Sequence, residues 1–328
     1  MSNIKNILRT NVPWIVLVVL LVVFRIASPS FMTGKNLENI LVQNSYLLVI
    51  SFGITVIMMS GGMDLSVGYQ ISIIGVVVGM CLNKGVPVAL CILLAILIGV
   101  GYCLMNCLLS GLLKLPLLVV SLATMTIGQG LSFIISGAYS YYGFPESFRW
   151  FGQGRLAGIS VPVIIALIMF IITSVMLQRT YYGRYVMAIG GNEEASNLAG
   201  INVKKMRILI AVFEGICVGI GTVMLVGKLG SAQSQVGPGT EFTVLTAVIL
   251  GGVSIRGGEG KVSGTVAGIL ILAILSNGMQ LAGLTTYHQY VAKGLIMLLA
   301  IAIDILNLKA NQNRDSAIVH NIESDNND

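Results

Sequence analysis

The sequence predicts an all-α protein that crosses a membrane many times. Of its 328 residues, 55% are hydrophobic and only 10% are charged, whereas an ordinary soluble domain carries about 25% charged residues. The apolar residues form long runs close to the ~20 residues that a membrane-spanning helix needs, not the short alternating segments of a membrane β-barrel. A soluble globular domain, a disordered chain and a fibrous repeat are therefore excluded.

The expected spans follow from these runs, taken in order. The first run begins after Lys5 and Arg9 and ends near Ala27. It lacks a small-residue cleavage site and further runs follow it, so we interpret it as a retained span and not as a signal peptide. The runs at 45–60 and 242–255 are short, which makes both candidates for tilted, broken or re-entrant segments. The remaining runs lie at roughly 65–82, 87–110, 117–137, 161–178, 208–228, 262–284 and 288–307, giving a polytopic bundle of about 10 spans (8–10).

Basic residues predict the orientation of the spans. With the N-terminus in the cytosol, twelve lysine and arginine residues fall on the cytosolic side and five on the outer side, which is the bias of the positive-inside rule. Both termini and a segment at about 179–207 are then cytoplasmic. Residues 1–307 form one transmembrane domain, and the polar stretch 308–328 is expected to be a disordered cytosolic tail. Because basic loop residues report orientation here, the net charge of +6 does not indicate nucleic-acid binding.

Neither a catalytic site nor a metal site is predicted. The five cysteines lie in apolar runs, no CxxC pair occurs, and the two histidines are far apart, so a disulfide framework or a zinc site is not expected. The stretch Gly257–Lys261 looks like a phosphate-binding loop, but Ile255 and Val262 occupy positions where a Walker A sequence needs Gly and Ser or Thr. We therefore expect no nucleotide site and no cofactor in this chain.

Polar residues interrupt the apolar sequence at three places. Asp64 lies in the glycine-flanked stretch Gly61–Gly68, where a carboxylate can cap a broken helix or line a polar path, and both interpretations stay open. Glu214 lies inside a span, where it can pair with a basic residue of the inner loop or face a water-filled cavity. After a Gly-Pro-Gly turn, Thr240 is expected to be a helix N-cap, with Glu241 in the first turn.

Glycines four residues apart occur at three places inside the spans. Such pairs make a flat stripe that lets two helices approach closely. We expect ordinary packing within the bundle, with a dedicated dimer contact as the alternative for one of the three pairs. The pairs are Gly75–Gly79, Gly215–Gly219 and Gly264–Gly268.

The segment at 179–207 predicts a short cytosolic helix. Asn192 is a good N-cap, two glutamates follow it at the positive end of the helix, and Gly200 is a natural stop. A helix of about two turns buries little by itself and needs a partner. That partner is either the bilayer surface or a cytosolic protein, with Leu198 and Ile201 as the apolar contacts.

This segment resembles the cytoplasmic coupling segment of ribose-type ABC importer permeases. The resemblance spans about 40–305, with the matching motifs in the family's order. Two stretches depart from the family's usual pattern. The departure at Phe242–Ala247 bears on the structure of that span and on substrate choice, and the departure at Ser196-Asn197 bears on which ATPase the permease pairs with. The motifs are Gly183-Arg184, Ala188–Ala195, Leu198–Ile201, Gly62–Gly68, Glu241, Leu250–Ser254, Gly257-Gly258, Gly264-Thr265 and Asn277-Gly278.

The resemblance implies the pore subunit of a binding-protein-dependent sugar importer in the bacterial inner (plasma) membrane. Two identical or related permease copies would pair with cytosolic ATPase subunits, which would bind ATP and Mg, and an extracellular binding protein would deliver the sugar. ATPase closure would move the coupling helix and switch the pore between inward and outward access. The alternatives are a related permease for branched-chain amino acids, nucleosides or a furanosyl signal, and an ion-coupled secondary transporter using Asp64, Glu214 or Asp304.

The resemblance also assigns residues to two sites. The ATPase-coupling residues are Gly183, Arg184, Gly191, Asn192, Glu193, Glu194, Ala195, Leu198, Gly200 and Ile201. The residues of the translocation path or helix break are Gly62, Asp64, Ser66, Gly68, Glu241 and Asn277.

Overall fold

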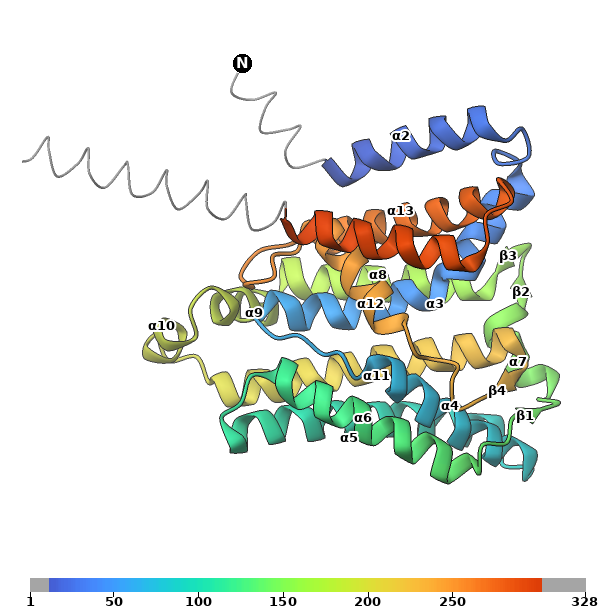
Figure 1. Ribbon diagram of the computed structural model, residues 1–328. Coiled ribbons are helices and arrows are strands. Elements are labelled where there is room, and N and C mark those ends of the chain that lie inside the picture. The colour runs from blue at the N-terminus through green and yellow to red at the C-terminus, as the bar shows by residue number, and fades with distance from the viewer. Residues whose placement is uncertain (1–11, 303–328) are drawn as a thin grey trace, which may run out of the picture.

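Long helices that run side by side make up most of the molecule (Figure 1). The structure, a computed structural model, describes residues 12–302. The predicted all-α, multi-pass class is confirmed, because helices of this length and composition can cross a membrane. Six described helices meet that standard: α3 (Gly34–Met59), α5 (Val88–Leu113), α6 (Leu117–Ser136), α8 (Val161–Arg179), α11 (Val203–Leu229) and α13 (Val262–Leu281).

Shorter elements complete the fold. Three more helices are apolar but shorter, namely α2 (Val12–Ala27), α4 (Val67–Asn83) and α12 (Thr240–Leu250). The last described residues, 286–302, are also helical. Polar connections hold α7 (Glu146–Gln153), α9 (Tyr181–Gly191) and α10 (Glu193–Leu198). Two-residue strands pair antiparallel, β1 (Tyr141–Tyr142) with β4 (Ser231–Ala232), and β2 (Arg155–Leu156) with β3 (Ile159–Ser160).

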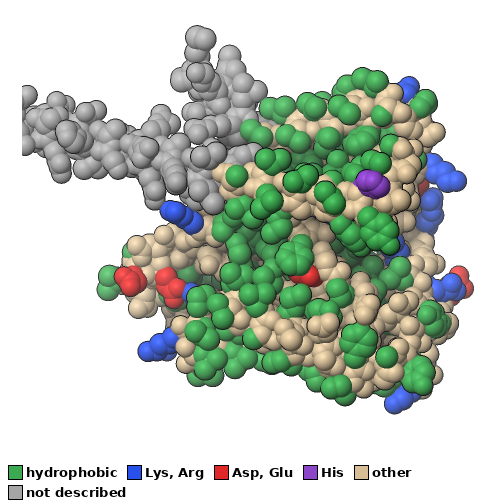
Figure 2. All heavy atoms as spheres, in the orientation of Figure 1, with side chains coloured by type: hydrophobic (Ala, Val, Ile, Leu, Met, Phe, Trp, Pro, Cys, Tyr) green, Lys and Arg blue, Asp and Glu red, His purple; other side chains and the backbone are tan. Residues whose placement is uncertain are grey.

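The core sits around α3, α4 and α11, whose side chains are mostly buried. The outer helices α5, α6 and α8 bury one side and expose apolar residues such as Leu97, Ile127 and Ile171 on the other. On the face drawn in Figure 2, hydrophobic side chains cover the middle and charged side chains gather mainly at the two ends. This is the surface that a lipid bilayer requires of a spanning bundle.

Glycine lets the central helices touch through their backbones. A Cβ atom on Gly219 of α11 would lie 2.7 Å from the Ile96 Cα of α5, and one on Gly215 would overlap the backbone of Val100. The pair at 264–268 packs in the same way against the backbone of α12, at Ala247 and Gly251. The expectation that these glycines serve packing within the bundle is confirmed.

One expected boundary needs correction, and one expected short segment is confirmed. The span expected at 45–60 begins earlier, at Gly34, because the Thr33 hydroxyl caps the helix by accepting from the Asn36 N–H at 3.4 Å. Polar residues fill the first turns of α3, so the apolar run alone underestimates its length. The segment expected at 242–255 is short, as predicted, because α12 has 11 residues, about 16 Å of helix against the ~30 Å of a hydrocarbon core. The predicted tail 308–328 and both termini lie outside the described residues.

Candidate functional site

The break between α3 and α4 brings a buried carboxylate into the middle of the protein. After α3 ends, Gly61 turns the chain with φ +82°, and Asp64 follows with only 1% of its surface exposed. Asp64 Oδ1 accepts hydrogen bonds from the backbone N–H of Ser66 at 2.6 Å and from its hydroxyl at 2.5 Å. The carboxylate therefore supports the entry into α4, which is the capping geometry that the sequence allowed.

The second oxygen of Asp64 connects the break to two helices, α4 and α5. Oδ2 accepts from Asn106 Nδ2 of α5 at 3.1 Å and from Gln70 Nε2 of α4 at 3.3 Å. Both amides also donate to the Ser66 hydroxyl, at 2.9 and 2.8 Å, and the Cys103 thiol donates to Gln70 Oε1 at 3.3 Å. With four donors on its two oxygens, Asp64 is satisfied as an anion.

A small cavity of about 30 Å³ lies against this network, with room for a water-sized molecule. We call it the inner cavity, and its polar lining is Ser60, Asp64, Cys103, Ser110, Arg207 and Glu214. Glu214 of α11 is 1% exposed, and its Oε1 has no hydrogen-bond partner among the described residues. Of the residues that the sequence singled out inside a span, Glu214 thus faces a cavity.

The inner cavity does not fit a metal ion. The side-chain ligand atoms of Asp64, Cys103 and Glu214 lie within 4.8 Å of one another, a spacing that would admit one by distance alone. However, the four donors on Asp64 occupy its acceptor sites, and the Cys103 thiol donates a hydrogen bond and so keeps its proton. A metal would need the thiolate and free carboxylate lone pairs.

A larger groove of about 1240 Å³ opens beside the inner cavity. It lies between α10 and the ends of α5 and α6 near Lys114 and Pro116, and it includes Glu193 and Asn197. The two hollows share lining residues, among them Gly62, Ser110 and Arg207. We call it the α10 groove, and its shared lining places it directly beside the inner cavity.

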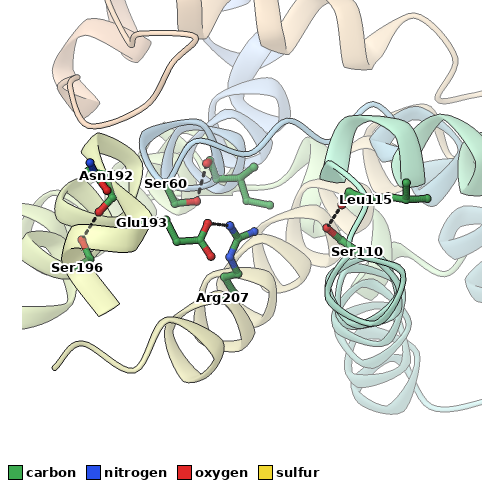
Figure 3. A network of polar contacts seen from close by, with 8 residues as sticks. Ser60, Ser110, Leu115, Asn192, Glu193, Ser196 and Arg207 are labelled. Atoms are coloured by element: carbon green, nitrogen blue, oxygen red, sulfur yellow. Dashed lines mark hydrogen bonds and ion pairs between the residues drawn. The ribbon is translucent and has the colours of Figure 1, made fainter. Parts of the chain in front are cut away.

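The short helix α10 forms where the sequence predicted it. Asn192 is its N-cap and accepts from the Ala195 N–H at 2.9 Å, and Gly200 ends it with φ +86°. Leu198 is 89% exposed, whereas Ile201 is half-buried and packs against the main core. In Figure 3 the Glu193 carboxylate points at Arg207, and these two side chains form an ion pair that fastens the start of α10 to α11.

The helix before α10 was not predicted. Gly183, Gly190 and Gly191 look like loop residues, yet α9 runs through them. Glycine is needed at position 183 because a Cβ atom on Gly183 would overlap the backbone of Leu177. It is needed at position 190 because a Cβ atom on Gly190 would overlap the backbone oxygen of Met59. The end of α9 therefore touches the break after α3, and the Gly258 N–H donates to the same Met59 oxygen at 2.8 Å. The sequence motifs around 61, 190 and 257 meet at one point.

The remaining residues that were predicted for the translocation path or helix break lie outside this network. Glu241 is buried and its Oε1 accepts from the Gly239 N–H at 2.9 Å, so Gly239 is the N-cap of α12 and the expectation for Thr240 is wrong by one residue. A Cβ atom on Gly68 would overlap Glu241 Oε2, which places these two residues together. Asn277 instead exchanges two hydrogen bonds with Asn36 of α3, at 2.8 and 3.0 Å.

Sequence reasoning missed Gln70, Cys103, Asn106 and Arg207 as site residues. A polar or thiol side chain in an apolar run carries no local sign of which helix it faces. The one usable signal was the i, i+4 spacing from Ser66 to Gln70, which puts both on one helix face.

Comparison with known proteins gives the family. The family described as branched-chain amino acid transport system / permease component matches residues 36–301. The ribose import permease protein of Bacillus subtilis (strain 168) is 36% identical over 298 residues, covering 89% of this chain and 91% of that protein. The L-arabinose transport system permease protein of Escherichia coli (strain K12) is 35% identical over 296 residues, covering 90% of each. No solved structure matches. The chain therefore belongs to the family of branched-chain amino acid transport system permease components.

Proposed function

We propose that this chain is the transmembrane pore subunit of an ATP-driven sugar importer in the bacterial inner membrane. The observation that carries the proposal is the similarity along about nine-tenths of the chain to permeases named for ribose, L-arabinose and galactose import. The chain itself carries no Walker A sequence, so energy comes from partner ATPases that bind ATP and Mg. An extracellular binding protein delivers the sugar, and a second permease copy, identical or related, completes the pore.

The topology that fits this function has about 10 spans, both termini in the cytosol, and α10 on the cytosolic side. The charge bias supports it, as does the position of α10 beyond the end of the bundle (Figure 1). Alternating access then requires that a movement of α10 reach the pore. The Glu193–Arg207 ion pair offers the connection, because it joins α10 to α11 in the core.

The substrate is tested by reconstitution into liposomes with the ATPase and the binding protein encoded by the neighbouring genes. We expect ATP-dependent uptake of one of ribose, L-arabinose or galactose, with no uptake when the binding protein is omitted. Leucine serves as the comparison substrate because the family description names branched-chain amino acids. Uptake of leucine alone, or uptake driven by an ion gradient without ATP, would contradict the proposal.

The coupling role is tested by Leu198→Asp. A charge at this exposed apolar position should prevent α10 from entering an apolar groove on the ATPase, and truncating a well-packed anchor costs about 2 kcal/mol or more. We expect normal abundance in the membrane, loss of ATPase co-purification and loss of uptake. Lys204→Ala is the matched control, because it changes the charge beside α10 by the same amount and leaves α10 intact. A Leu198→Asp complex with full uptake would remove the coupling role from α10.

A further inference from the structure

We propose that the inner cavity is a proton-binding site, in which Glu214 carries the proton as a neutral carboxylic acid beside an ionised Asp64. The site goes beyond the importer function and does not depend on the transported solute. Its basis is an asymmetry between two buried carboxyl groups that face the same small space.

The first observation is the difference in hydrogen bonding. Asp64 accepts four hydrogen bonds from Ser66, Gln70 and Asn106, all of them buried. Glu214 is as deeply buried and lines the cavity, but its hydrogen-bonding neighbour is the Cys103 thiol alone in place of four donors, and its Oε1 has no partner among the described residues. Two carboxylates this close in a buried site do not both ionise, and the negative charge stays on the group whose donors stabilise it.

The second observation is the set of groups around Glu214. The titratable and charged side chains that face it are Asp64, Cys103, Cys107, Tyr182, Arg207 and Cys217. The α3 residues beside it, Gly53 and Ile57, carry no titratable group. Arg207 is the single cation among them, and its guanidinium binds Glu193 at the mouth of the cavity. The one cation in this set is therefore already paired with a carboxylate other than Glu214.

The third observation argues for a proton against a metal cation. The side-chain amides of Gln70 and Asn106 direct their N–H groups toward Asp64. In a cation site, the oxygens of these amides would face the cation instead. The cavity has room for one water molecule, to which a protonated Glu214 can donate from its unpaired oxygen. A proton that leaves Glu214 passes to water in the α10 groove, and no other bond forms or breaks.

The test is infrared spectroscopy of the purified full-length permease in lipid nanodiscs at neutral pH. A protonated carboxylic acid gives a C=O stretch well separated from carboxylate bands. We expect such a band in the wild-type protein, its loss in Glu214→Gln, and its retention in Glu241→Gln. Glu241 is the matched control because it is also buried with an unpartnered oxygen, but it lies on α12 outside the inner cavity. A wild-type protein whose protonated-acid signal is unchanged by Glu214→Gln would overturn the proposal.

A melting experiment provides an independent readout. Glutamine has the shape of a neutral glutamic acid, so Glu214→Gln should change the melting temperature by less than about 2 °C. If Glu214 were instead an ionised ligand for a cation, Na⁺, Ca²⁺ or Zn²⁺ would raise the melting temperature of the wild-type protein and not of the variant. That ion-dependent difference would also overturn the proposal, whereas its absence together with the infrared result supports it.

Discussion

Adding one methyl group between α5 and α11 should loosen the site. In Gly99→Ala the new Cβ would overlap Gly215 O of α11 and lie 3.3 Å from Gly219 N. These are backbone atoms, which cannot rotate away as a side chain can, so the two helices must separate. Overpacking of this kind costs about 1–3 kcal/mol, and the better helix propensity of Ala returns at most about 1 kcal/mol. We expect a net loss of about 1 kcal/mol.

The same displacement should affect the polar network, because Cys103 and Asn106 follow Gly99 on one face of α5. Separation of the helices stretches the Asn106–Asp64 hydrogen bond of 3.1 Å and widens the inner cavity. Uptake should fall together with stability. The assay is thermal unfolding of the purified permease in detergent, where the expected loss lowers the melting temperature by about 2 °C or more.

The control is Gly101→Ala, two residues further along α5. A Cβ atom there has nothing within 4 Å, so this variant gains helix propensity without a collision. Its melting temperature should equal or exceed that of the wild-type protein. Equal melting temperatures for the variants at 99 and 101 would refute the reasoning, because the two substitutions differ only in what the new methyl group meets.

Three further predictions concern α10, Asp64 and the topology. Glu193→Arg and Arg207→Glu should each reduce uptake, and the double variant should restore it. The melting temperature should hardly change, because the partly exposed ion pair is worth about 0–1 kcal/mol. A double variant that still binds the ATPase but transports nothing would argue against this contact. Asp64→Asn should lower the melting temperature and the abundance, because its NH₂ group would face the amide donors of α4 and α5, and wild-type values for both would contradict this. In a cysteine-free background, Leu198→Cys and Tyr139→Cys, both at exposed positions, should react with impermeant reagents from opposite sides; labelling of position 198 in intact cells would disprove the orientation.

The fate of two earlier expectations illustrates how local information works. The bounds of α10 were predictable, because an N-cap at Asn192 and a positive φ at Gly200 depend on neighbours within four residues. The start of α3 was not predictable from hydropathy, since its first turns carry polar residues and the apolar run begins later. The helix α9 was also not predictable from local sequence. Its glycines look like turn residues, but Gly183 and Gly190 are needed because the backbone of other segments lies against them.

The sequence by itself determined the class of the protein, because a chain with this many apolar runs and so few charges can satisfy its backbone only as helices in a bilayer. It also determined the short helix α10 and marked Asp64 as a break residue. Only the tertiary structure decided that Ser66, Gln70, Asn106 and Glu214 converge on Asp64, while Asn277 pairs with Asn36. The physical reason is that a buried polar side chain needs partners, and these come from helices far apart in the chain, whose rotation and approach are set by packing.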